Sequence, residues 1–166
     1  MIQLGLLSIE HMADVLRIQE YCYTEIEPES SESLQAKIVA SPATCLLAES
    51  SEGAVGYLIA VPIVYPNLPA LNAPMFELSK GADTLYIHDL AVASAGRGKG
   101  VAQALVRTAI DAAKRSGLAR ACLVAIQNSQ KFWEQFGFEV VAEPANELKA
   151  KLASYGAGAQ LMRAWI

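Results

Sequence analysis

The chain has 166 residues, 53% of them hydrophobic and 18% charged, which fits one globular domain with a sizeable core rather than a disordered chain. No apolar run approaches the roughly 20 residues that span a bilayer, and the N-terminal residues lack the pattern of a signal peptide. We therefore expect a cytoplasmic protein without a membrane partner. The formal net charge of −4 argues against a general nucleic-acid binder. Three scattered cysteines and two histidines predict neither a disulfide framework nor a metal site.

The hydrophobic patterns predict alternating strands and helices along one domain, residues 1–166. In chain order they are a strand over 2–7, helices over 8–21 and 31–41, strands over 44–48, 55–65 and 84–92, a helix over 98–116, a strand over 121–126, a helix over 129–136, and strands over 138–141 and 159–165. Residues 66–83 hold three prolines and form a long connection, and long connections tend to be functional. If the helix over 98–116 is a crossover, the strands on either side of it are parallel. The fold class is then α/β, with a mixed sheet whose parallel pair lies in its middle.

A glycine-rich turn joins the strand over 84–92 to the helix that follows it, in the stretch LAVASAGRGKGVAQALV from Leu90 to Val106. Its glycines remove side chains where a ligand must approach the backbone, and the free N–H groups of the first helical turn suit a phosphate. Arg97 and Lys99 add positive charge there. Two other nucleotide-binding loops do not fit. The sixth position of G-x-G-x-x-G is Val101 or Gln103, and a P-loop needs Ser or Thr where Gly100 stands.

The pattern that does fit is R-x-x-G-x-A, formed by Arg97, Gly100 and Ala102. It resembles the acetyl-CoA-binding motif of the GNAT superfamily of N-acetyltransferases. A second stretch, Asn128 and then FWEQFGF over 132–138, resembles the family's helix that ends in a Gly-Phe run. The order of the elements is also similar to that of the family, so the resemblance covers nearly the whole chain. It implies a GNAT-like sheet that splays open at the parallel pair.

The resemblance implies an acetyl-CoA cosubstrate, no metal, and transfer of the acetyl group to a primary amine by direct attack. Backbone groups of Leu90, Ala91 and Val92 would pair with the pantetheine arm like an added strand. The amides of 97–102, namely Arg97, Gly98, Lys99, Gly100, Val101 and Ala102, would hold the pyrophosphate. Asn128 would bond the pantetheine arm, while Phe132 and Trp133 would pack near the thiol.

Direct attack needs a base for the amine, which is protonated at neutral pH, and an acid for the leaving thiolate. His88 is the candidate base. The arylalkylamine branch of the superfamily resembles this segment, with histidines at the positions of Tyr86 and His88. Without a bulge, Tyr86, His88 and Leu90 would share one face of the strand. The alternative is that His88 has only a structural role, as a buried histidine hydrogen-bonded to the backbone.

The general acid departs from the family pattern, because Trp133 stands where most relatives carry tyrosine. An indole N–H does not protonate a thiolate. Either the thiolate leaves unassisted, or a hydroxyl such as that of Ser129 or Tyr155 reaches the sulfur. The substitution also leaves open a catalytically weak module that binds or senses acyl-CoA.

The acceptor site would lie between the first two helices and the proline-rich loop. The segment from Glu10 to Glu32 contains seven acids and one base, which suits a cationic amine. Tyr21 and Glu27 are plausible lining residues. The candidates that we retain for substrate binding are Tyr23, Glu25, Tyr65 and Tyr86. The acceptor would be a small-molecule or peptide amine, and a homodimer would be common for this family. An interaction protein whose turn merely connects two elements remains an alternative.

Overall fold

The computed structural model describes residues 1–23, 29–126 and 128–166. Its helices are α1 (Met12–Cys22), α2 (Ser31–Ala40), α3 (Val101–Arg115), α4 (Gln130–Glu134) and α5 (Asn146–Ala153). Its strands are β1 (Gln3–Leu6), β2 (Cys45–Ser50), β3 (Gly53–Ile63), β4 (Thr84–Val92), β5 (Arg120–Ala125), β6 (Glu139–Val140) and β7 (Gln160–Trp165). Short 3₁₀ turns over Ile9–His11, Pro42–Thr44 and Ser94–Gly96 connect several of them. No helix in the described part of the chain is long and apolar enough to cross a bilayer.

The strands form one sheet in the order β1-β2-β3-β4-β5-β7-β6. Only the central β4–β5 pair is parallel, and the other neighbours are antiparallel. The mixed α/β sheet with a parallel pair in its middle is therefore confirmed. Since α3 lies between β4 and β5 in the sequence, it is the crossover that a parallel pair requires.

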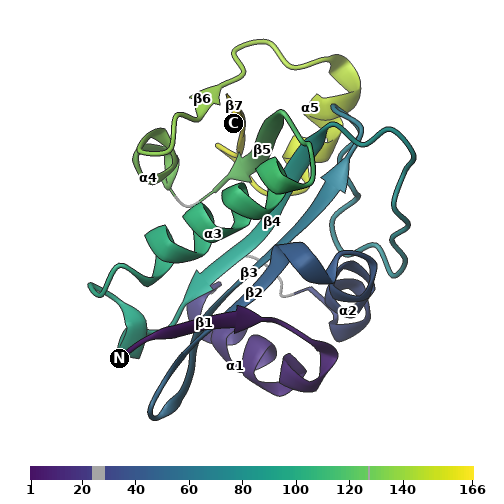
Figure 1. The fold of residues 1–166 in the computed structure, drawn as a ribbon. Helices are drawn as coiled ribbons and strands as arrows, with labels where there is room; N and C mark the ends of the chain where they lie inside the picture. Colours follow the sequence, from purple (N-terminus) through teal and green to yellow (C-terminus); the bar gives the residue numbers. More distant parts are fainter. Residues whose placement is uncertain (24–28, 127) are drawn as a thin grey trace.

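Helices cover both faces of the sheet (Figure 1). The α3 residues Leu105, Val106 and Ala109 pack on one face against strand residues such as Leu58 and Leu85. The opposite face is covered by α1 and α2, whose buried residues include Val15, Ile18, Leu34 and Ile38. Each strand alternates its side chains between these two layers, as a sheet buried on both faces requires.

The structure differs from the sequence-based prediction at the ends of several elements, among them α1, which begins at Met12 rather than Ser8, and α4, which spans Gln130–Glu134 rather than 129–136. Helix α3 begins at Val101 rather than Gly98, because Gly98 and Gly100 have φ angles of 73° and 74° that a right-handed helix cannot include. Strand β6 has two residues instead of four. Helix α5 was not predicted, since half of its sequence NELKAKLA is polar and it buries only Leu148.

Candidate functional site

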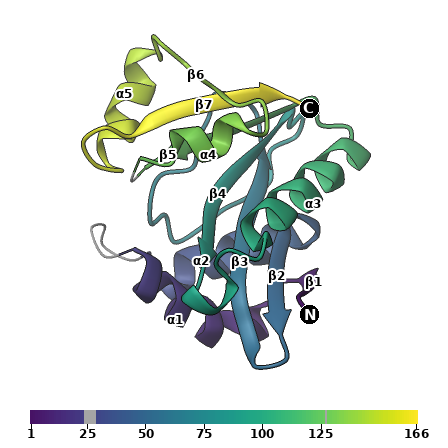
Figure 2. The ribbon, with the colours of Figure 1, turned by 90° about the vertical axis from the view of Figure 1, so that its left-hand side faces the viewer.

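The central strands separate partway along their length. Strands β4 and β5 pair from Thr84 to Ile87 on β4, opposite Arg120 to Leu123 on β5. Beyond Ile87 they diverge (Figure 2), and a cavity of about 320 Å³ lies at the divergence. The predicted site residues that line this cavity are Tyr23, His88, Leu90, Ala91, Val92, Arg97, Ala102, Phe132, Trp133 and Tyr155. Ser129, the other hydroxyl considered as an acid, lines it too.

The β4 edge along this cavity carries backbone carbonyls that side chains reach. The Tyr23 hydroxyl donates to the Leu90 carbonyl at 2.7 Å. The Val92 carbonyl accepts from Cys22 Sγ at 3.4 Å and from Arg97 Nε at 3.3 Å. Because β5 pairs with β4 only as far as Ile87, these acceptors are available to a ligand that extends the sheet.

A β-bulge interrupts β4 at the cavity. Asp89 lies opposite Ile59 of β3, but the next pair is Ile87 with Ala60, so His88 has no partner on β3. The bulge places Leu90 on the α3 side of the sheet, with Leu85 and Ile87, while Tyr86 belongs to the opposite layer. Tyr86, His88 and Leu90 were expected to share one face of β4 only if the strand contained no bulge. Because β4 does contain a bulge, that expectation does not apply. Bulges re-aim side chains beside functional sites.

The glycine turn between β4 and α3 has the backbone that its sequence requires. Gly98 and Gly100 both adopt the left-handed conformation, and Gly100 is the N-cap of α3. A methyl group added at either glycine would meet no atom within 4 Å, so both positions face open space. The exposed N–H groups at the start of α3 therefore have room for an anion.

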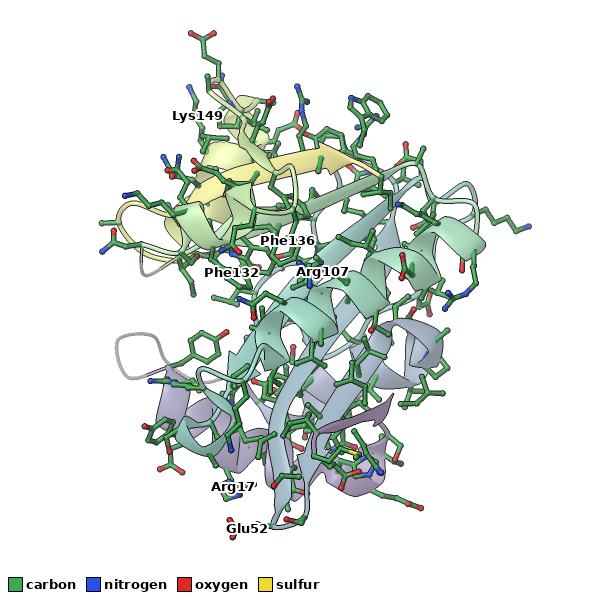
Figure 3. All side chains as sticks on the ribbon, turned by 60° about the vertical axis from the view of Figure 1, so that its left-hand side comes forward. Arg17, Glu52, Arg107, Phe132, Phe136 and Lys149 are labelled. Carbon is green, nitrogen blue, oxygen red and sulfur yellow. The ribbon has the colours of Figure 1, made fainter. Side chains whose placement is uncertain are left out.

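Aromatic rings form the wall of the cavity on the α4 side. Phe132 and Trp133 meet edge to face with their centroids 4.9 Å apart. Phe136, just after α4, lies 5.3 Å from Phe132, and the Arg107 guanidinium of α3 lies 5.9 Å from the Phe136 ring. Figure 3 shows Arg107 beside the two phenylalanines, where α3 and α4 approach one another. Sequence reasoning did not select Phe136 or Arg107.

The hydroxyl of Tyr155, a residue that lines the cavity, is paired with a second tyrosine hydroxyl. Tyr155, which follows α5, and Tyr86 of β4 are hydrogen-bonded with their oxygens 2.8 Å apart. Burial raises the pKa of Tyr155 to about 12 and raises the pKa of Tyr86 well above its ordinary value. Both hydroxyls therefore remain protonated at neutral pH and can donate.

Several ionisable side chains are buried at or near the bulge. The His88 side chain is 1% exposed, and its Nε2 is bonded to a carboxylate oxygen of Glu29. The other Glu29 oxygen lies 3.5 Å from Nζ of Lys37, which is fully buried in α2. Asp89 accepts a hydrogen bond of 2.7 Å from Tyr57. Burial raises the pKa of Asp89, while the charge of His88 and the Tyr23 and Tyr57 hydroxyls lower it and leave a net upward shift.

Some predicted site residues lie elsewhere. Tyr65 is not at the cavity, because its ring lies 4.5 Å from the Arg120 guanidinium near the closed end of the β4–β5 pair. Asn128 is exposed, has a φ of 59°, and lines a separate hollow with residues of α4. Tyr86 is fully buried. Glu25 and Glu27 lie outside the described residues. Gly98, Lys99, Gly100 and Val101 lie at the turn beside the cavity rather than in its wall.

Sequence reasoning missed Glu29, Lys37 and Asp89. Lys37 carried a detectable signal, since it shares the buried face of α2 with Leu34 and Ile38 at helical spacing. A lysine on such a face is buried only when it has a partner. The identity of that partner, Glu29, depends on the packing of the segment before α2 and has no local signature.

Three comparisons place these features among known proteins. A family model described as the acetyltransferase (GNAT) family matches residues 12–138. No curated protein gives a match. Among solved structures, the chain is similar to the loading GNATL domain of CurA from Lyngbya majuscula, with a TM-score of 0.78 and 12% identity, covering 99% of this chain and 98% of that one.

Two further solved structures carry bound groups. Arabidopsis thaliana Naa50 in complex with the bisubstrate analogue CoA-Ac-MVNAL has a TM-score of 0.71 and 15% identity, covering 98% of this chain and 97% of that one. The GphF GNAT-like decarboxylase in complex with isobutyryl-CoA has a TM-score of 0.76 and 13% identity, covering 98% of both chains. At these identities the likenesses establish a common fold.

Proposed function

The chain belongs to the acetyltransferase (GNAT) family, and on that basis we propose that it transfers an acetyl group from acetyl-CoA to a primary amine of a small molecule or peptide. The observation that carries the proposal is the open β4 edge, which leads directly into a glycine turn at the start of α3. An extended amide-containing arm and a pyrophosphate together match this pair of features. The similar structures that hold a CoA-containing analogue and isobutyryl-CoA support the same assignment.

The cavity fits such a cosubstrate. Leu90 and Val92 offer carbonyls to the amides of the arm, in exchange for their bonds to Tyr23, Cys22 and Arg97. The N–H groups at the start of α3, with Arg97 and Lys99 nearby, face the position of the pyrophosphate. Phe132 and Trp133 cover the apolar part of the arm. Arg107, beside Phe136, adds a cation farther along α3.

His88 is the proposed base. Its Nδ1 is buried and has no hydrogen-bond partner among the described residues, so it can accept a proton from the amine, directly or through one water molecule. The bulge leaves the backbone at His88 without a β3 partner next to the cavity. We propose that a backbone N–H at this bulge stabilises the negative charge that develops on the thioester oxygen.

Tyr155 is the proposed acid. Its protonated hydroxyl lines the cavity, and Tyr86 fixes it through their mutual hydrogen bond. Most relatives carry a tyrosine at the position of Trp133. In this chain the Tyr155 hydroxyl, from the β7 side of the cavity, would take the role of that tyrosine. Ser129 is the alternative hydroxyl for this role, and it also lines the cavity.

We further propose that the acceptor amine enters from the α1 side, past Tyr23, toward the buried carboxylates Glu29 and Asp89. Negative potential there attracts a protonated amine. Glu25, which precedes α2, would add to it. A peptide N-terminus is one such acceptor, as the peptide part of the Naa50 analogue illustrates for that protein.

Trp133 and the decarboxylase among the similar structures favour a specific second function. In it, the chain binds or senses an acyl-CoA without transferring the acyl group to an amine. Both functions share the cavity and differ in whether an amine is consumed.

Thermal unfolding with acetyl-CoA, free CoA and NADH tests the proposal first. A ligand that binds only the folded chain stabilises it by about 2.7 kcal/mol at a hundredfold excess over Kd. We expect stabilisation by both CoA compounds and none by NADH. Thiol release from acetyl-CoA is then followed with a panel of primary amines, and with no amine as the control. Stabilisation by CoA without amine-dependent thiol release supports the second function, whereas no stabilisation by CoA contradicts both.

A further inference from the structure

Glu29, which lies 59 residues before His88 in the sequence, contacts it directly at the bulge. The contact joins the segment before α2 to β4, and neither residue is near the surface: the side chains are 8% and 1% exposed. Its geometry bears on which nitrogen of the imidazole is able to accept a proton.

The carboxylate of Glu29 is fixed from several directions. Ser33 Oγ donates to its Oε2 at 2.7 Å, and Lys37 Nζ lies 3.5 Å from the same oxygen while donating to Ser33 Oγ at 3.0 Å. Its backbone carbonyl accepts from Gln19 Nε2 of α1 at 3.2 Å. The second oxygen, Oε1, is thereby left for His88 Nε2.

The ionisation of Glu29 decides the imidazole tautomer. Burial alone would raise the pKa of Glu29, but the hydrogen bond and charge of His88, the charge of Lys37 and the Ser33 hydroxyl together lower it to about 2. The carboxylate is therefore ionised at neutral pH and only accepts hydrogen bonds. The Nε2–H of His88 is directed to this carboxylate in both charge states of the ring, so the proton that distinguishes the two states is the one on Nδ1, and the neutral ring carries its lone pair there.

The Nδ1 atom has the environment of a functional group rather than a structural one. Of the described residues, only His88 Nδ1 and Arg120 Nε are buried side-chain polar atoms without a hydrogen-bond partner. A histidine that serves only to tie elements together would have both nitrogens bonded, because an unpaired buried acceptor is costly. In His88 the bonded nitrogen faces Glu29, and the unpaired one belongs to a residue that lines the cavity.

From this geometry we infer that Glu29, held by Ser33 and Lys37, is a positioning residue that fixes His88 as the base through Nδ1. This inference rests on the proposed function. During transfer, Nδ1 takes the proton of the amine nitrogen, Nε2 keeps its own, and Glu29 stays ionised opposite the imidazolium. The other charged and titratable groups near His88 are Asp89 on β4, with its partners Tyr23 and Tyr57, and Tyr86 with Tyr155.

The test is the pH dependence of kcat/KM for Glu29→Gln, Lys37→Met and the parent chain. Glu29→Gln removes the anion that stabilises the imidazolium, so we expect kcat/KM to fall at least tenfold and its acidic limb to move to lower pH. Lys37→Met removes a cation from the same cluster, so the limb moves to higher pH. Glu32→Gln is the matched control, because Glu32 is exposed in the first turn of α2, and it should leave the profile unchanged.

A double-mutant cycle with His88→Ala keeps the test decisive if Lys37→Met fails to fold. If Glu29 acts through His88, then Glu29→Gln has no further effect on kcat in the His88→Ala chain. Equal fold losses in both backgrounds, or an acidic limb that does not move in Glu29→Gln, would overturn the inference. Acetyl-CoA binding, measured by thermal shift, should be the same in all variants. Failure of the parent chain to bind CoA or to consume an amine would instead contradict the proposed function.

Discussion

At the scale of single residues, the cavity brings together groups that no short motif connects. Tyr155 meets Tyr86 across 69 residues of sequence, and Glu29 meets His88 across 59. Sequence reasoning selected Tyr155 and His88 as candidates for proton transfer and Tyr86 as a candidate for substrate binding. It could not pair them, because pairing depends on the register of β4 and the path of the chain after α5.

Replacing Tyr155 with Phe tests the proposed acid. The change removes the hydroxyl from the cavity and keeps the ring, so we expect kcat to fall by about 100-fold, a typical contribution of a general acid, while the KM for acetyl-CoA changes little. Steady-state thiol release measures both constants. Tyr65→Phe is the control, since the Tyr65 hydroxyl accepts from Arg163 away from the cavity. An unchanged kcat in Tyr155→Phe would contradict Tyr155 as the acid. The remaining explanations would be protonation by Ser129 or unassisted departure of the thiolate.

At the scale of elements, the turn before α3 was the part of the site best predicted from sequence. Glycines, basic residues and a following helix are local features, and the structure confirms the turn they indicate. The β4 bulge is different. No residue in TLYIHDLAV requires it, and it arises from pairing between β3 and β4. That is why the face of β4 occupied by Leu90 could be predicted only on the condition that no bulge occurs.

Gly100 offers an element-scale prediction. Its φ of 74° is unfavourable for any residue with a Cβ, although a methyl group there would meet no neighbour. Gly100→Ala should therefore lower the free energy of unfolding by about 1–2 kcal/mol through backbone strain alone. Gly100→Asn should lose less, because asparagine tolerates this conformation and caps helices well. Urea unfolding of the two variants measures the difference, and equal losses would contradict the strain argument.

At the scale of the whole molecule, the parallel centre of the sheet followed from the order of the elements and the crossover helix, whereas the position of β7 between β5 and β6 was not predicted. Element order and a crossover are global constraints on topology, and few arrangements satisfy them. Helix α5 did not follow, because eight residues, half of them polar, carry too weak a periodic signal. Lys37 illustrates the opposite case: its position at helical spacing from Leu34 and Ile38 signalled burial, but its ion partner came from tertiary packing.

Stability toward acid is a property of the whole molecule, and we expect Glu29 to make a large contribution to it. Its pKa is about 2 in the folded chain, against an ordinary value of 4.5. Stability from this group is thus complete above about pH 5 and is lost as the pH falls toward 2, where the unfolded chain has already taken up the proton. The loss amounts to about 3 kcal/mol, from 1.36 kcal/mol for each unit of pKa.

Urea unfolding of the parent chain and Glu29→Gln at several pH values measures this contribution. We expect the parent to be more stable at pH 7 and its advantage to shrink steadily between about pH 5 and pH 2. An advantage that stays constant over that range would show that the glutamate is not preferentially ionised in the folded chain.

The side chains that reach the β4 carbonyls have a consequence for self-association. A strand edge with free backbone acceptors in the middle of a sheet is a template for any other chain in extended conformation, and such pairing leads to aggregation. Tyr23 covers the Leu90 carbonyl, while Cys22 and Arg97 cover that of Val92. These contacts, which the cosubstrate must replace when it binds, therefore protect the open β4 edge from strands of neighbouring molecules. The protein can thus keep an edge that binds a ligand without exposing one that promotes aggregation.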